Sequence, residues 1–159
     1  MNKRAAVKSI IARLAEELAS SIKASRTAHE EATHEESKAE DKYDTRGLEA
    51  AYLAGGQAKQ AAETEKAIAA YESLMLRKFE LTDPIDLTAL VELESDGERS
   101  FYFIGPASGG LEFRHAGMEI LVVTPQAPLG RNLLGKKKGD KVKLLLGNAA
   151  VEYRILSVS

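Results

Sequence analysis

Apolar residues near the beginning of the chain recur at the three- and four-residue spacing of one helix face. A stripe with this alternating spacing is typical of a coiled coil. Small residues continue the stripe from Ser21 to Ala32, so the predicted contact face narrows toward the far end of the helix. The large residues of the stripe are Val7, Ile11, Leu14 and Leu18.

A second stripe has its small residues first and its large residues last, which reverses the order of the first stripe. Folding the chain back near residues 39–44 therefore places large residues beside large ones and small residues beside small ones. The two patterns predict an antiparallel coiled-coil hairpin over residues 1–80. The second stripe comprises Ala51, Ala54, Ala58, Ala61, Ile68, Met75 and Phe79.

The pair Gly55-Gly56 lies inside the second helical stripe. Each glycine in a helix interior costs about 1 kcal/mol relative to alanine. A close approach of the two helices, or a local kink, would account for the pair.

The composition changes abruptly at Asp83-Pro84. All four prolines and nine of the twelve glycines lie from Pro84 onward, which places a boundary near residues 81–85. We therefore expect an α+β protein in which the hairpin is followed by a small β-rich domain over residues 85–159.

Short runs of β-branched and aromatic residues indicate the strands of this second domain. Asp96-Gly97 is a hairpin signal, and Pro128 and Gly135 are the expected start and stop of a short helix. We expect a strongly bent sheet that carries this one helix. The predicted strands are residues 87–93, 100–104, 118–123, 141–146 and 151–158.

Composition excludes several classes of protein. The 159 residues include no cysteine and only three histidines, which argues against a disulfide framework, a thiol nucleophile and a zinc knuckle. A formal net charge of -2 argues against a general nucleic-acid binder, because phosphate binding needs a basic domain. The apolar stretch near the N-terminus is too short for a signal peptide or a membrane span. We expect a cytoplasmic protein with no membrane association.

The small net charge conceals three charged segments. Residues 1–26 hold six basic and two acidic side chains, residues 30–49 hold eight acidic and three basic ones, and residues 131–143 hold six basic and one acidic. An acidic cluster at a hairpin tip is often only a solvated surface that prevents aggregation. It also suits Mg²⁺, which prefers oxygen ligands and often shares them with a partner.

Three segments resemble the bacterial GreA/GreB family of transcript-cleavage factors. Residues 34–43 (HEESKAEDKY) resemble the family's tip motif H-G-D-L-K-E-N-A-E-Y. Residues 127–140 (APLGRNLLGKKKGD) resemble S-P-L-G-R-A-L-L-G-K-x-x-G-D, and residues 152–158 resemble the closing strand of the family. The order of the segments and the length of the chain match across nearly the whole sequence.

The resemblance implies a transcription elongation factor that binds bacterial RNA polymerase. Its coiled coil would enter the secondary channel of the polymerase, and its FKBP-like C-terminal domain would anchor at the channel rim. Two acidic tip residues of the family help to hold a Mg²⁺ ion at the polymerase active site, where backtracked RNA is cleaved. The chain would therefore complete the polymerase's own site rather than be an enzyme, and would contact RNA only indirectly. Because the two helices of an antiparallel hairpin bury each other's apolar stripe, we expect a monomer.

The resemblance assigns the functional positions of the family to individual residues of this chain. The tip Asp of the family falls on Glu36 and the tip Glu falls on Ala39, beside which Glu40 and Asp41 supply carboxylates. The candidate catalytic and metal-binding residues are thus Glu36, Glu40 and Asp41. The candidate partner-binding residues are Lys38, Tyr43, Ala127, Pro128, Leu129 and Arg131.

Several of these residues have a simpler structural interpretation. Tyr43 would be either a clamp beneath the tip or a contact inside the channel, and Lys38 could merely screen its acidic neighbours. Pro128 and Leu129 would be a helix start and a core residue, or contacts with the polymerase.

Two other functions stay open on the sequence alone. Ala39, at a position where the family has an acid, favours a non-cleaving relative that occupies the same channel and inhibits or modulates transcription. An FKBP-like chaperone or prolyl isomerase is the other, although aromatics make up only 6% of the chain, few for a pocket of that kind.

Overall fold

The computed structural model describes residues 2–34, 45–146 and 148–159. The chain forms two compact units. One consists of Met1–Ile11 together with Ala70–Ser159, and the other is Ala12–Ala69.

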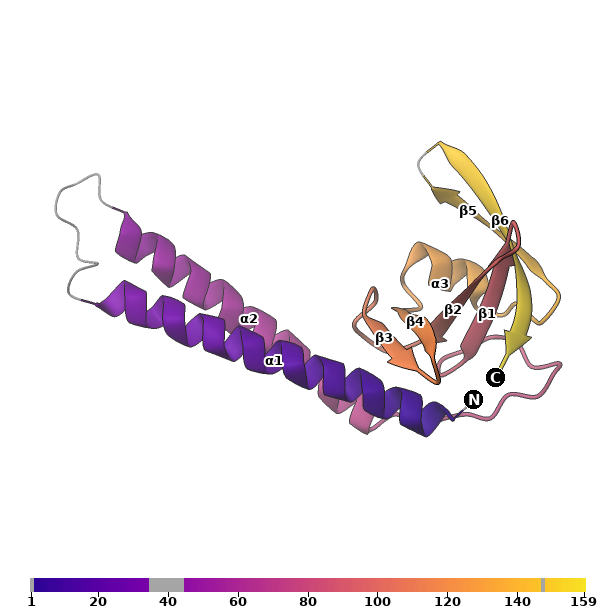
Figure 1. Cartoon of the computed structure of the whole chain (residues 1–159), viewed down its shortest axis with the longest axis horizontal. Helices are drawn as coiled ribbons and strands as arrows, with labels where there is room; N and C mark the ends of the chain where they lie inside the picture. The colour runs from indigo at the N-terminus through magenta and orange to yellow at the C-terminus, as the bar shows by residue number, and fades with distance from the viewer. Residues whose placement is uncertain (1, 35–44, 147) are drawn as a thin grey trace. The chain divides into compact units, whose positions relative to one another are not determined.

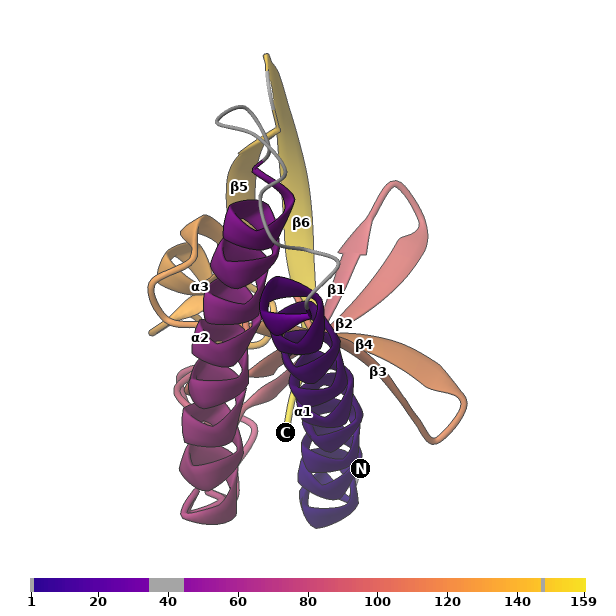
Figure 2. The same ribbon diagram turned by 90° about the vertical axis from the view of Figure 1, so that its left-hand side faces the viewer.

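The unit Ala12–Ala69 is made by two long helices. Helix α1 (Lys3–Thr33) and helix α2 (Arg46–Glu72) run antiparallel and side by side through it (Figures 1 and 2). The Ser25 hydroxyl donates a hydrogen bond to the carbonyl oxygen of Ala54 at 3.2 Å, which joins the two helices directly. The predicted helical hairpin is confirmed. Its buried residues in this unit include Leu14, Ala28, Ala61, Thr64 and Ala67.

The predicted stripe on α2 is right in part, because Ala61 is buried and Ala54 and Ile68 are half-buried. Ala51 and Ala58 are exposed, and α2 ends at Glu72, so Met75 and Phe79 follow the helix instead of extending it. Met75 is 90% exposed. Ala51, Ala54, Ala58 and Ala61 nevertheless line one groove together with Ile22 and Ser25 of α1, so the predicted face of α2 is right. Because burying so small a side chain gains little free energy, alanines on this face can stay partly exposed.

The stripe on α1 is largely right. Val7 and Leu14 are buried, whereas Ile11 and Leu18 are half-buried. Ile10, which the stripe omits, is completely buried. The buried face of α1 is therefore turned slightly from the predicted one.

The second domain is one six-stranded sheet with the strand order β3-β4-β2-β1-β6-β5. Neighbouring strands are antiparallel except β2 and β4, which pair in parallel. A short helix, α3 (Pro128–Leu133), follows β4. The expected α+β class is confirmed (Figure 1). The strands are β1 (Leu90–Ser95), β2 (Glu98–Ile104), β3 (Glu112–His115), β4 (Met118–Val123), β5 (Lys141–Leu146) and β6 (Ala149–Val158).

Both faces of this sheet bury apolar side chains. On one face, Val91 and Leu93 of β1 pack in a cluster with Leu133 of α3. The alternate residues of the neighbouring strands, such as Phe103 of β2 and Val122 of β4, are also fully buried. Because side chains on a strand alternate between faces, these residues form a second layer on the opposite side. None of the described helices is long and apolar enough to cross a membrane.

Candidate functional site

The tip residues to which the sequence assigns a function fall outside the described residues. This applies to Glu36, Lys38, Glu40, Asp41 and Tyr43. Within residues 2–34, 45–146 and 148–159, no three acidic, histidine or cysteine side chains gather in a way that could hold a metal ion. The assignment of Mg²⁺ ligands therefore stays a prediction.

Two hydrogen bonds between Thr45 and Glu49 stabilise the start of α2 after the tip. The Thr45 hydroxyl donates a hydrogen bond to the Glu49 carboxylate at 3.0 Å, and the Glu49 amide donates to the Thr45 carbonyl oxygen at 2.9 Å. Glu49 is the acidic residue in the first turn of α2, where a negative charge is favourable to the helix dipole. The second helix of the hairpin thus begins with its own stabilising contacts.

The second predicted site is α3 with the residues around it. Ala127 precedes the helix with extended backbone angles (φ -65°, ψ 150°), and Pro128 occupies the first turn, where a missing amide hydrogen costs nothing. The Arg131 amide donates to the Ala127 carbonyl oxygen at 2.9 Å. A Cβ at Gly130 would overlap the carbonyl oxygen of Thr124, so the close approach of α3 to the end of β4 requires glycine.

The four predicted docking residues divide into two groups. Pro128 and Arg131 are exposed, whereas Ala127 and Leu129 are half-buried and pack against the core cluster. Only Pro128 and Arg131 are therefore freely available to a partner. The Arg131 guanidinium Nε donates to the Gln126 carbonyl oxygen at 2.9 Å, which fixes the direction of this cation.

A rigid basic turn follows α3. The Ile85 amide donates to the Lys136 carbonyl oxygen at 2.7 Å, and the Lys137 amide donates to the Asp140 carboxylate at 2.8 Å. Lys136, Lys137 and Lys138 are exposed, and no described carboxylate pairs with them or with Arg131. Farther along, a hydrogen bond from Lys141 (2.6 Å) holds the pKa of Glu152 below its usual range. Arg131 and Lys136 to Lys138 thus have no carboxylate partner among the described residues, whereas Lys141 is paired with Glu152.

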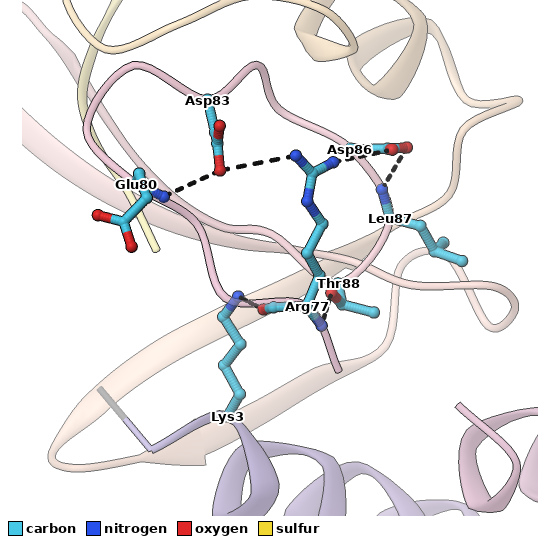
Figure 3. Close-up of polar contacts among 7 residues, drawn as sticks. All are labelled: Lys3, Arg77, Glu80, Asp83, Asp86, Leu87 and Thr88. Atoms are coloured by element: carbon cyan, nitrogen blue, oxygen red, sulfur yellow. Dashed lines mark hydrogen bonds and ion pairs between the residues drawn. The ribbon is translucent and has the colours of Figure 1, made fainter. Parts of the chain in front are cut away.

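A third cluster, which the sequence did not predict, lies in the segment between α2 and β1. We call residues 73–89 the strap. The Lys3 ammonium donates to the Arg77 carbonyl oxygen at 2.6 Å and lies 4.2 Å from the centre of the Phe79 ring. The Arg77 guanidinium lies 4.9 Å from the centre of the same ring. The first turn of α1 is thereby fixed to the strap (Figure 3).

Two carboxylates of the strap hold Arg77 in place. Its guanidinium lies 3.6 Å from Asp83 and 3.5 Å from Asp86, and its backbone amide donates to the Thr88 hydroxyl at 3.1 Å (Figure 3). Thr88 has a φ of 70°, which is strained for a β-branched residue. The bond from Arg77 and the bond from the Thr88 amide to Ile104 (2.8 Å) hold it there.

Lys3 is the titratable group most affected by this arrangement. Burial, and secondly the positive charge of Arg77, lower the pKa of Lys3 to about 8. The sequence patterns did not predict this cluster, because Lys3 and Arg77 are 74 positions apart in the chain. The closely spaced Asp83 and Asp86 after Arg77 were the available local signal.

The C-terminal part of the chain matches a known family. A family model described as "Transcription elongation factor, GreA/GreB, C-term" matches residues 82–159, which include α3, the basic turn and all six strands. The transcription elongation factor GreA of Paracoccus denitrificans (strain Pd 1222) is 27% identical over 94 residues, or 54% of this chain and 56% of that protein. The chain thus matches little more than half the length of this curated relative.

Solved structures with low sequence identity extend over almost the whole chain. GreA factor homolog 1 (Gfh1) of Thermus thermophilus is 23% identical, with a TM-score of 0.39 and 94% of each chain covered. Gfh1 of Thermus aquaticus is 25% identical, with a TM-score of 0.41, over 92% of this chain and 94% of that chain.

Proposed function

Residues 82–159 belong to the GreA/GreB family of transcription elongation factors, and on this premise we propose that the whole chain binds bacterial RNA polymerase through its secondary channel. There it stimulates Mg²⁺-dependent cleavage of backtracked transcripts. The observation that carries the proposal is the family match over the domain that holds α3 and the basic turn.

The β-rich domain supplies the docking surface. Pro128 and Arg131 are exposed on α3, and Lys136 to Lys138 follow on a turn whose backbone is fixed by hydrogen bonds. Exposed cations that have no carboxylate partner attract an acidic surface and raise the rate of association. This region therefore suits docking on an acidic part of the polymerase.

The helical hairpin carries the catalytic contribution at its tip. Glu36, Glu40 and Asp41 would offer carboxylate oxygens to a Mg²⁺ ion that the polymerase also binds. The ion would supply Lewis-acid activation of a water molecule. Because the polymerase provides the remaining ligands and the RNA, the chain is an accessory factor and has no activity alone.

A backtracked elongation complex with a labelled transcript 3′ end tests this function. The parent protein is expected to release a short 3′ fragment in the presence of Mg²⁺, because it completes the metal site. Glu36→Ala and Glu40→Ala are expected to slow release at least about tenfold, the effect of about 1.4 kcal/mol on the barrier. Glu63→Ala changes an exposed acid in the middle of α2 and is the matched control. The cleavage role is wrong if the parent releases no fragment.

Ala39 supports a second candidate function. It stands where the family resemblance expects an acid, and a shift of one residue along a helix turns a side chain by about 100°. A non-cleaving factor would bind the polymerase and compete with an authentic cleavage factor, but release no fragment itself. Loss of both competition and cleavage would contradict both candidates.

A further inference from the structure

A groove opens on the compact unit formed by Met1–Ile11 and Ala70–Ser159. Its volume is about 1070 Å³, just above the range of roughly 300–1,000 Å³ for ligand sites. The first turns of α1, the end of α2 and the strap line it. The residues that line the groove include neither those of the tip nor those of α3. A ligand in the groove would therefore make other contacts than those proposed above for the polymerase.

Most of the apolar side chains that line the groove are aliphatic. Val7 and Ile11 come from α1, while Leu74, Met75 and Leu76 come from the strap. Met75 is 90% exposed. An unbranched, polarisable thioether that projects into solvent beside other aliphatic side chains is well suited to pack against an incoming apolar side chain.

The rim of the groove is predominantly positive. The first turn of α1 has no acidic residue to offset the positive end of the helix dipole. Burial, and secondly the positive charge of Arg77, lower the pKa of Lys3. Arg4, Lys8 and Lys78 have no ion-pair partner in the described part of the chain. The lining includes the basic residues Lys3, Arg4, Lys8, Arg77 and Lys78 and the acidic residues Glu72 and Glu80.

This combination disfavours single-stranded nucleic acid as the occupant. Such ligands are held by aromatic rings on which bases stack. Phe79 lines the groove, but the cations of Lys3 and Arg77 already lie over its ring at 4.2 and 4.9 Å. Tyr71, the other aromatic residue of the lining, is 1% exposed. The remaining apolar contact surface is therefore aliphatic, which suits aliphatic side chains better than bases.

We propose that this groove binds an acidic amphipathic segment of a partner protein. Aliphatic side chains of that segment pack on Met75, Ile11 and Leu74, and its carboxylates face Arg4, Lys8 and Lys78. This is the helix-in-groove mode of recognition, in which apolar anchors give affinity and flanking charges give orientation.

Selection from a displayed library of random peptides tests the chemistry of the occupant. The full chain is the bait, and the peptides are long enough for about four helical turns. We expect enrichment of sequences that combine leucine, isoleucine or methionine at helical spacing with several acidic residues. An absence of enrichment, or enrichment of basic sequences, would overturn the proposal.

Matched variants then locate the site, with a fluorescent form of the selected peptide as the probe. Met75→Glu is expected to weaken peptide binding at least about tenfold, or about 1.4 kcal/mol, because it places a carboxylate among the apolar contacts. Leu81→Glu makes a comparable change at a residue that is 75% exposed and does not line the groove, and should leave the affinity unchanged.

Charge-reversal variants test whether the cations at the rim of the groove contribute more to peptide binding than exposed cations elsewhere in the chain. Lys8→Glu combined with Lys78→Glu should also weaken binding, whereas Lys136→Glu with Lys137→Glu should not. All these side chains are exposed, so thermal unfolding should be the same for every variant. Equal effects of the two pairs, or displacement of the peptide by single-stranded RNA, would show that the groove is not a site for acidic peptides.

Discussion

At the scale of single residues, Tyr71 is a buried residue that the helical periodicity of the sequence did not predict. This side chain in the last turn of α2 is 1% exposed, and its hydroxyl donates to the Ala107 carbonyl oxygen at 2.8 Å. A Cβ at Gly105 would overlap the same hydroxyl. The predicted stripe omits Tyr71, because the residues that enclose it lie more than 30 positions later in the chain.

Replacement of this tyrosine by phenylalanine tests the role of its hydroxyl. Tyr71→Phe should lower the free energy of unfolding at pH 7 by about 1 kcal/mol, since the Ala107 carbonyl loses its donor. Burial raises the pKa of Tyr71 above its usual value, which is near 10. The unfolded chain therefore loses this proton at lower pH than the folded one, and the tyrosine's contribution falls as the pH rises above about 10.

Urea unfolding at pH 7 and at pH 11 measures both effects. The parent should lose more stability between the two values than Tyr71→Phe does. Tyr52→Phe is the control, because Tyr52 is 75% exposed. Parallel pH profiles for the parent and Tyr71→Phe would refute the burial argument.

At the scale of elements, Gly55-Gly56 is not explained by a close approach of the two helices. Both residues lie inside the continuous helix α2, are exposed, and would have no atom within 4 Å of an added Cβ. Close helix approach at these positions is therefore wrong. The glycines are an intrinsic weakness of α2, not a packing requirement.

Alanine at either position should strengthen the helical hairpin. We expect Gly55→Ala and Gly56→Ala each to raise the free energy of unfolding by about 0.5–1 kcal/mol, because alanine loses less backbone entropy in a helix. Chemical denaturation monitored by helical circular dichroism measures this. Gly130→Ala, which would meet the Thr124 carbonyl oxygen, should be destabilising in the same assay. A loss of stability in both Gly55→Ala and Gly56→Ala would contradict the argument.

The elements that carry a strong local signal were predictable. The runs 118–123 and 141–146 correspond to β4 and β5, and Asp96-Gly97 forms the predicted turn with φ of 52° and 83°. Strand β3 was missed because its four residues, EFRH, contain a single buried side chain. The motif around α3 identified Pro128 and Arg131, whereas the contacts between Lys3 and the strap depend on tertiary structure alone.

At the scale of the whole molecule, near-neutrality comes from segregated charge. Basic side chains gather along the groove rim and on the turn after α3, while acids are concentrated in residues 30–49. The net charge of -2 therefore gives little information about how the surface interacts with partners. Interactions at these separate patches should each weaken with added salt, because exposed charges are screened within about 10 Å at 0.1 M salt.

Charge reversal on α3 should weaken binding to RNA polymerase without affecting the fold. Arg131→Glu is expected to raise the dissociation constant at least about fivefold, by about 1 kcal/mol, since it replaces a fixed cation of the proposed docking surface. Arg114→Glu makes the same change on β3, at another exposed residue of the sheet domain, and is the control. Titration of the polymerase with labelled variants measures the difference. Equal losses for both variants would remove α3 as the docking element.

The strand order also determines how a partner can approach the sheet. The two edge strands of the sheet are β3 and β5. β3 is only four residues long and carries Glu112 and Arg114, while β5 presents Lys141 and Lys143. A short, charged edge strand such as β3 resists the addition of a foreign strand, whereas the six-residue β5 also exposes Leu145. The β3 edge is therefore protected against edge-to-edge aggregation, and complexes at that edge should form through side chains rather than by extension of the sheet.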